Sequence, residues 1–148
     1  MLRILLDTSF ILPILGIDTG AIVRKILEKL NDLSAEIYYS HFNILEAIWV
    51  SIKLIREGSL DVDRFSRGLR SIYASNRLMI IDEDPFIFEY ALKLYMMGHR
   101  DMIDNILYST ALHKGLKFLT LDEELIEFIK SKGLNRDVII LPKDVNIK

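Results

Sequence analysis

Four acidic residues stand where strands are expected to end or helices to begin: Asp7, Glu46, Asp104 and Asp122. A carboxylate at such a place is seldom needed for folding. Several in one crevice would repel one another unless a cation or shared protons neutralised them. Carboxylate oxygens suit Mg²⁺ or Mn²⁺, and such a cation activates water and offsets charge on phosphate oxygens. The pattern therefore predicts a divalent-metal site for cutting phosphodiester bonds.

Each acid also has an ordinary structural role open to it. Asp7 suits a turn, and Asp122 suits a helix N-cap. Asp101 and Asp104 lie one helical turn apart on the same face, so one of them is expected to be the cap. Glu46 lies in a very apolar helix, so a position that faces only solvent is a less satisfactory interpretation of it. The expected placement of all four main acids at one sheet edge favours the metal site.

Within this site, Asp7 and Asp122 are expected to be direct or near ligands because both follow strands. Asp104 and Glu46 would complete the site directly or through water, and which carboxylate accepts the proton of the attacking water stays open. Asp101 is a secondary candidate of this site. Three hydroxyl residues are further secondary candidates that could hydrogen-bond a carboxylate or a phosphate, and turn and cap chemistry accounts for them equally well. They are Thr8, Ser9 and Thr120.

Short apolar runs and helical periodicity alternate along the chain. The apolar runs predict buried strands over residues 2–6, 37–39, 78–81, 117–119 and 138–141. Caps and apolar spacing predict helices over about 18–32 (capped by Asp18), 42–57, 63–75, 85–97, 102–113 and 122–132. The alternation indicates an α/β, three-layer fold: a central five-stranded parallel sheet flanked by helices, with ligands beyond the carboxyl ends of the strands.

Composition fits one domain over residues 1–148. Hydrophobic residues make up 51% of the chain, cysteine is absent, and no apolar stretch reaches the roughly 18 residues of a membrane span. A soluble, cytoplasmic protein is expected. Net charge is −2, which excludes a generic basic nucleic-acid binder. Once four acids are assigned to a cation, however, the 19 Lys and Arg residues outnumber the remaining acids.

The acids lie in four short motifs, which read Leu5-Leu6-Asp7-Thr8-Ser9, then Ser40 with Glu46 six residues later, then Asp104 to Ala111, then Thr120-Leu121-Asp122. In this order and spacing, over nearly the full length, the chain resembles PIN-domain ribonucleases and is similar to the VapC-type toxins of toxin–antitoxin pairs. Two departures are Asn105 and Tyr108, which stand where the family has small apolar residues.

The resemblance implies a Mg²⁺- or Mn²⁺-dependent endoribonuclease that hydrolyses RNA and leaves a 5′-phosphate. It also implies a PIN-like fold, the four acids as catalytic and metal-binding residues, and an antitoxin protein as a partner. A housekeeping RNA-processing nuclease of the same family stays open. The intact acidic quartet argues against a catalytically idle interaction module.

A receiver-like phosphoacceptor domain is the rival from another class. It too has a parallel sheet with an acidic Mg²⁺ pocket, and Asp82, Asp84 and Lys143 follow expected strands three and five. A single Asp after the first strand argues against it. So do the two expected helices in each of the segments between strands two and three and between strands three and four.

Two helices carry further interaction signals. The helix over 42–57 is apolar almost all round, including Trp49, which favours a homodimer or an antitoxin contact. Arg64, Arg67 and Arg70 recur every three residues and could follow an RNA backbone, although such a stripe is also typical of a solvated face. The three histidines show no metal-ligand spacing.

Overall fold

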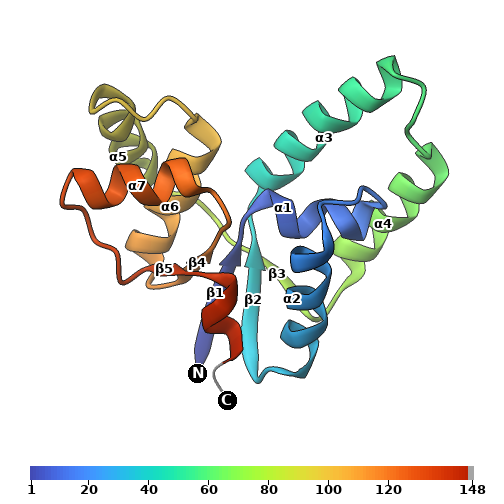
Figure 1. Cartoon of the computed structure of the whole chain (residues 1–148), viewed down its shortest axis with the longest axis horizontal. Helices are drawn as coiled ribbons and strands as arrows, with labels where there is room; N and C mark the ends of the chain where they lie inside the picture. Colours follow the sequence, from blue (N-terminus) through green and yellow to red (C-terminus); the bar gives the residue numbers. More distant parts are fainter. Residues whose placement is uncertain (147–148) are drawn as a thin grey trace.

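The computed structural model describes residues 1–146, which form a five-stranded parallel sheet between two layers of helices (Figure 1). The strands run in the spatial order β3-β2-β1-β4-β5. Their bounds are β1 Leu2–Leu6, β2 Ala35–Tyr39, β3 Leu78–Ile80, β4 Lys117–Leu119 and β5 Ile139–Ile140. The α/β fold with a central parallel sheet, expected from the alternating pattern, is confirmed.

Helices connect every pair of consecutive strands. Their bounds are α1 Thr8–Ile11, the 3₁₀ helix η1 Leu12–Leu15, α2 Ala21–Asp32, α3 His41–Arg56, α4 Val62–Ala74, α5 Pro85–Met96, α6 Met102–Lys114 and α7 Glu123–Ser131. The 3₁₀ helix η2, Pro142–Asn146, follows β5. The paired helices predicted between β2 and β3, and between β3 and β4, are both present. Within residues 1–146, no helix has the length and apolar character needed to cross a membrane.

Several predicted boundaries were wrong. The Asp18 side chain does not cap α2. It accepts a hydrogen bond from the Gly20 amide at 3.0 Å, and the helix begins at Ala21 after Gly20 as N-cap. Strand β2 begins at Ala35, two residues earlier than predicted. The short helices α1 and η1 had no sequence signal because they hold only one turn each, so no apolar periodicity develops.

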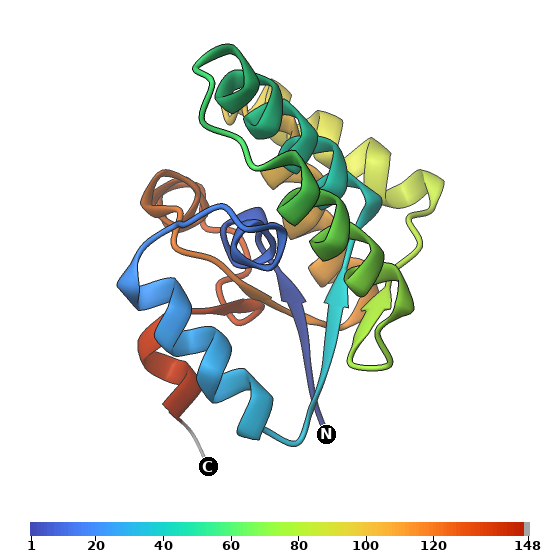
Figure 2. The same ribbon diagram turned by 90° about the vertical axis from the view of Figure 1, so that its right-hand side faces the viewer.

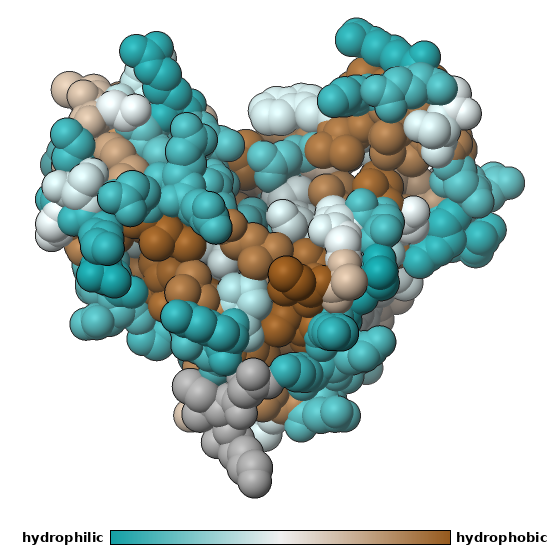
Figure 3. Space-filling view, viewed as in Figure 1, coloured by the Kyte–Doolittle hydropathy of each residue, from teal (hydrophilic) through white to brown (hydrophobic). Residues whose placement is uncertain are grey.

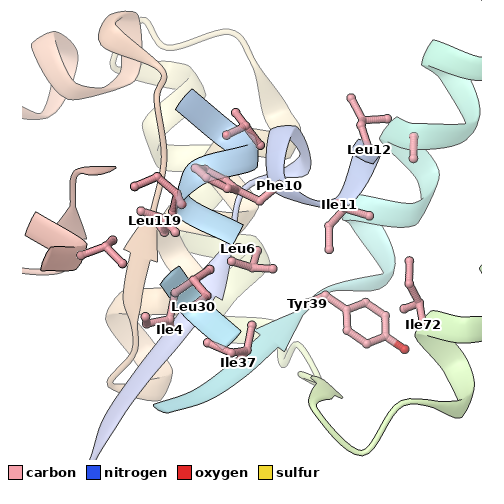
Figure 4. Packing of buried hydrophobic residues seen from close by; sticks show 14 of the residues in the cluster. Ile4, Leu6, Phe10, Ile11, Leu12, Leu30, Ile37, Tyr39, Ile72 and Leu119 are labelled. Atoms are coloured by element: carbon pink, nitrogen blue, oxygen red, sulfur yellow. The ribbon is translucent and has the colours of Figure 1, made fainter. Parts of the chain in front are cut away.

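Alternating side chains of β1 enter the cores on opposite faces of the sheet. Ile4 and Leu6 join the cluster under α1 to α4, which Figure 4 shows with Leu6 between Phe10 and Ile37. Leu5 joins the cluster under α5, α6 and α7. Turned by 90°, the molecule shows α2 and α4 in front of β1 and β2, on one side of the sheet (Figure 2). Burial on both faces explains why the second half of β1, Ile4-Leu5-Leu6, is apolar throughout.

The order of the strands reverses at β1. Strand β1 pairs with β2 on one side and with β4 on the other, both in parallel. After β1 the chain proceeds outward to β2 and β3, and it then returns to β4 on the far side of β1. Ligands of open α/β sheets bind at such a switch point, outside the carboxyl ends of the strands. In this chain that place lies between the residues that follow β1 and β4.

The sheet order also excludes the receiver-like reading. Flavodoxin-like folds, to which receiver domains belong, have the order 2-1-3-4-5, with β1 next to β3. Here β3 and β5 are the two edge strands. Asp82, which follows β3, and Lys143, which follows β5, therefore lie at opposite edges of the sheet and cannot share one phosphoacceptor pocket.

Candidate metal centre at the switch point

Asp7 leaves β1 at the switch point and is held by both neighbouring elements. Its amide donates to the Leu119 carbonyl at 3.0 Å, which extends the pairing of β1 with β4 by one residue. Its carboxylate caps α1, because Oδ1 accepts from the Thr8 amide at 2.7 Å. Oδ2 accepts from the Thr120 hydroxyl at 2.7 Å. The side chain is only 6% exposed, so both oxygens are fixed within the protein.

Thr120 joins the two strand ends. Besides donating to Asp7, its hydroxyl oxygen accepts from the Asp122 amide at 3.0 Å. Asp122 then caps α7, accepting from the Leu125 amide at 3.1 Å. One buried hydroxyl thus fixes the turn that places the Asp122 carboxylate beside β1. This contact gives Thr120, a secondary candidate from the sequence, a positioning role. Thr8 and Ser9 also line the site.

Helix α6 contributes two carboxylates. Asp101 is its N-cap and accepts from the Asp104 amide at 3.1 Å, as the cap interpretation predicted. Asp104 is 4% exposed, and its Oδ2 receives no hydrogen bond; among the described residues it is the one buried side-chain oxygen or nitrogen without a partner. Oxygens of Asp101, Asp104 and Asp122 lie within 4.8 Å of one another. Asp101 is therefore both a cap and a member of the compact group.

These residues line a cavity of about 390 Å³ that also receives Glu46 from α3. Glu46 is half-buried and stands outside the compact group of three, as does Asp7. The space-filling view has a notch at the edge toward which β1 and β2 point, between the sides that carry α3 and α7 (Figure 3). The fold therefore brings all four acids predicted from the sequence to one pocket, with Asp101 as a fifth.

Burial and mutual repulsion shift the proton equilibria of this pocket. Burial raises the pKa of Asp7 to about 6, against the hydrogen bonds from Thr120 and Thr8. Burial raises the pKa of Asp104 to about 10, with a hydrogen-bonded contact to Asp122 as the next cause. That contact lowers the pKa of Asp122. Burial also raises the pKa of Glu46. Without a cation, Asp104 therefore keeps its proton at neutral pH.

The donor set fits a hard divalent cation. All three members of the compact group offer carboxylate oxygens, and Oδ2 of Asp104 has no donor within the described chain. A cation there would displace the proton of Asp104 and give Oδ2 the partner that it lacks, which removes the cost of an unpaired buried polar atom. Oxygen ligands without His or Cys are those that Mg²⁺ and Mn²⁺ prefer.

Sequence reasoning missed Asn43, which links α3 to the end of β1. It is fully buried, and its amide nitrogen donates to the Leu6 carbonyl at 3.2 Å and to the Thr8 hydroxyl at 3.0 Å. Its oxygen accepts from the Ser40 amide at 2.7 Å, at the start of the helix that carries Glu46. The only available signal was an uncharged polar residue three positions after Ser40, which is common in helices and did not stand out.

Other singled-out residues have structural contacts. Arg64 donates to the Ile14 carbonyl at 2.9 Å, whereas Arg67 and Arg70 are exposed, and an RNA-facing stripe of these three residues on α4 stays a prediction. The two departures from the family pattern are explained as well. The Tyr108 hydroxyl donates to the Asn135 carbonyl at 2.6 Å, and Asn105 pairs with His99.

Fold and site together define an α/β protein with a carboxylate cluster at its topological switch point. The PIN domain family matches residues 4–130, which is most of the chain, so the chain belongs to that family. The search among curated proteins found no match.

Solved structures share the fold at low sequence identity. A toxin–antitoxin complex from Klebsiella pneumoniae has 16% identity and a TM-score of 0.58, over 93% of this chain and 96% of that one. VapBC2 from Rickettsia felis, bound to a DNA fragment from their promoter, has 19% identity and a TM-score of 0.62, over 95% and 97%. PAE2754 from Pyrobaculum aerophilum has 17% identity and a TM-score of 0.63, over 96% and 85%. At these identities the likeness concerns the fold.

Proposed function

We propose that residues 1–148 form one nuclease domain that hydrolyses RNA phosphodiester bonds with Mg²⁺ or Mn²⁺, and that the protein is the cytoplasmic toxin of a toxin–antitoxin pair. Membership of the PIN family supports a nuclease. The likeness of the fold to VapBC2 and to the Klebsiella pneumoniae toxin–antitoxin complex supports the toxin role. A housekeeping RNA-processing role would use the same site and differs only in its partner.

The observation that carries the proposal is the unpaired Oδ2 of Asp104. An α/β core can be completed without a buried carboxyl group, and leaving one without a donor destabilises the fold. The group is retained beside Asp101 and Asp122 in an open cavity, where a cation would satisfy all three. Perturbed acids clustered in a cleft are typical of functional sites.

Each residue then has a separate role. Asp101, Asp104 and Asp122 would hold the cation, which when bound polarises water and offsets charge on phosphate oxygens. Asp7, with both oxygens already accepting hydrogen bonds, stays fixed and supplies negative charge beside the group. Glu46 faces the same cavity from α3, and its raised pKa suits it to accept the proton of the attacking water. Water attacks phosphorus, the P–O3′ bond breaks, and the leaving 3′-oxygen takes a proton from solvent, so that a 3′-hydroxyl and a 5′-phosphate remain.

An antitoxin and a second copy of the chain are the proposed protein partners. The outer face of α3 carries an exposed apolar stripe, here called the α3 stripe: Leu45, Ile48, Trp49, Ile52 and Ile55. The chain's own residues leave this stripe exposed, as expected for an interface.

The test is cleavage of a single-stranded RNA by the purified chain. We expect cleavage with Mg²⁺ or Mn²⁺, none in EDTA, and recovery when Mn²⁺ is added in excess of EDTA. A DNA strand of the same sequence is the matched substrate control. Undiminished cleavage in EDTA would overturn the metal mechanism. Growth arrest upon expression of the wild type but not of Asp104→Asn would distinguish a toxin from an RNA-processing enzyme.

A further inference from the structure

Asn105 lies directly after Asp104 and points away from the acidic pocket, into a buried contact with His99. Asn105 is fully buried and His99 is 7% exposed. The Asn105 amide nitrogen donates to the His99 carbonyl at 2.8 Å, and its oxygen lies 2.7 Å from His99 Nδ1. Since an amide oxygen only accepts, Nδ1 carries the proton in this pair. One side chain thus binds both the main chain and the ring of the same residue.

This contact closes the turn between α5 and α6. The His99 amide donates to the Leu94 carbonyl at 3.1 Å, which ties the turn to the end of α5. The Asn105 amide donates to the Asp101 carbonyl at 3.0 Å, which ties the turn to the first turn of α6. Only Arg100 lies between His99 and Asp101, the two residues that these hydrogen bonds hold. Asp101, although exposed at the surface, therefore has little backbone freedom.

The same contact connects α6 with α7. The His99 ring packs against Phe128 of α7, with ring centres 5.1 Å apart. Helix α7 begins directly after Asp122, so His99 touches the helix that follows the third member of the acidic group. The carboxylates of Asp101 and Asp104 come from one side of this contact and that of Asp122 comes from the other. Asn105 and His99 thus span the elements that must stay in register to keep the three acids together.

We propose that Asn105, acting through His99, is a positioning residue that holds Asp101 in the cation-binding geometry. This inference rests on the proposed function, because it assumes that Asp101, Asp104 and Asp122 bind a cation. An unfixed turn would leave Asp101 with more conformations to lose on binding, and the affinity would fall accordingly. Outer contacts that orient metal ligands are typically worth about 10–100-fold in metal affinity.

The experiment measures Mn²⁺ affinity by titration calorimetry and metal-free melting temperature on the full chain. Asn105→Ala should lower Mn²⁺ affinity at least about 10-fold. Ser109→Ala is the matched control: Ser109 is fully buried in the same helix, one turn further on, and donates to the Ile87 carbonyl at 2.8 Å. It should lower the melting temperature while leaving Mn²⁺ affinity at the wild-type value.

A double-mutant cycle separates positioning from general stability. In an Asp101→Asn background, Asn105→Ala should change Mn²⁺ affinity less than about twofold, because the ligand that it positions is already lost. If Asn105→Ala does not fold, His99→Phe keeps the ring against Phe128, removes the Nδ1 hydrogen bond, and should still weaken Mn²⁺ binding.

The proposal is overturned if Asn105→Ala, or His99→Phe in its place, binds Mn²⁺ as the wild type does, or if its effect adds fully to that of Asp101→Asn. If the wild-type chain itself binds no Mn²⁺, the proposed function is overturned, and the positioning role of Asn105 is overturned with it.

Discussion

Helices α3 and α6 both border the acidic pocket. Both depart from the usual rule that apolar side chains are buried and polar ones exposed, but they do so in opposite ways. Helix α6 buries polar side chains, including Asp104, Asn105, Ser109 and Thr110. Helix α3 exposes apolar ones: Trp49 is 54% and Ile55 is 56% exposed. A buried polar group without a partner destabilises the fold. An exposed apolar stripe marks a surface for interaction with another molecule. The contrast supports the proposal that α6 helps to bind a small cation inside the fold and that α3 contacts a macromolecule outside it.

The largest expected effect falls on the polar interior of α6. Asp104→Asn should lower RNA cleavage about 1000-fold, because it removes an anionic ligand and leaves an amide in its place. Asp122→Asn should behave likewise. Asp101→Asn should cost less than Asp104→Asn, because Asp101 is exposed and partly occupied as a cap. Initial rates with saturating Mn²⁺ are the measurement. A greater loss in Asp101→Asn would mean that the outer carboxylate dominates the site.

The next effect concerns pH and metal-free stability. The folded-state pKa values of Asp7 and Asp104 are raised, so the folded chain binds more protons than the unfolded chain, and stability falls as pH rises. For Asp7, the rise from 3.8 to about 6 corresponds to about 3 kcal/mol lost between pH 4 and pH 7. For Asp104 the loss continues toward pH 10.

Chemical denaturation at pH 4.5 and pH 8 without metal tests this slope. Asp7→Asn and Asp104→Asn should each flatten it, and at pH 8 both should be at least as stable as the wild type. Saturating Mn²⁺ should remove most of the difference. Two variants that lose stability equally at both pH values would instead indicate that the titration of these carboxylates does not cause the pH dependence of stability.

A smaller effect is expected on the α3 stripe. Ile52→Glu should weaken self-association by about 2 kcal/mol or more, which is about 30-fold in the dissociation constant. Sedimentation velocity over a range of concentrations measures it. Lys25→Glu on α2 introduces a negative charge away from the stripe and should leave association unchanged. A wild-type chain that stays monomeric at all concentrations would rule out the homodimer and leave the antitoxin as the partner of this surface.

The smallest effect separates structural polar groups of α6 from the site. Tyr108→Phe removes the hydrogen bond to the Asn135 carbonyl and should lower the free energy of unfolding by about 1 kcal/mol. RNA cleavage should not change, because Tyr108 packs in the cluster under α5 and α7, away from the acidic cavity. A loss of cleavage beyond the loss of folded protein would extend the functional part of α6 by another turn.

Local sequence patterns determined the elements of this protein and the identity of its main acids. Apolar runs and caps are short-range features, so strands β1 and β4 and helices such as α5, with Asp84 and Pro85 at its start, could be predicted. Asp7, Glu46, Asp104 and Asp122 stood out because their places relative to strand and helix ends are also local. The one-turn helices α1 and η1 escaped because a single turn carries no periodicity.

Only the tertiary structure decided which acids share one group and which face the pocket singly. The distance between Asp101 and Asp122 depends on how α6 and α7 pack across the sheet, and no spacing along the chain encodes it. The partners of Asn43 and Asn105 were hidden for the same reason. A buried amide is selected by donors and acceptors that lie elsewhere in the sequence, such as the Leu6 carbonyl 37 positions before Asn43. The residue types indicated the chemistry of the site, whereas long-range packing determined the geometry that brings these residues together.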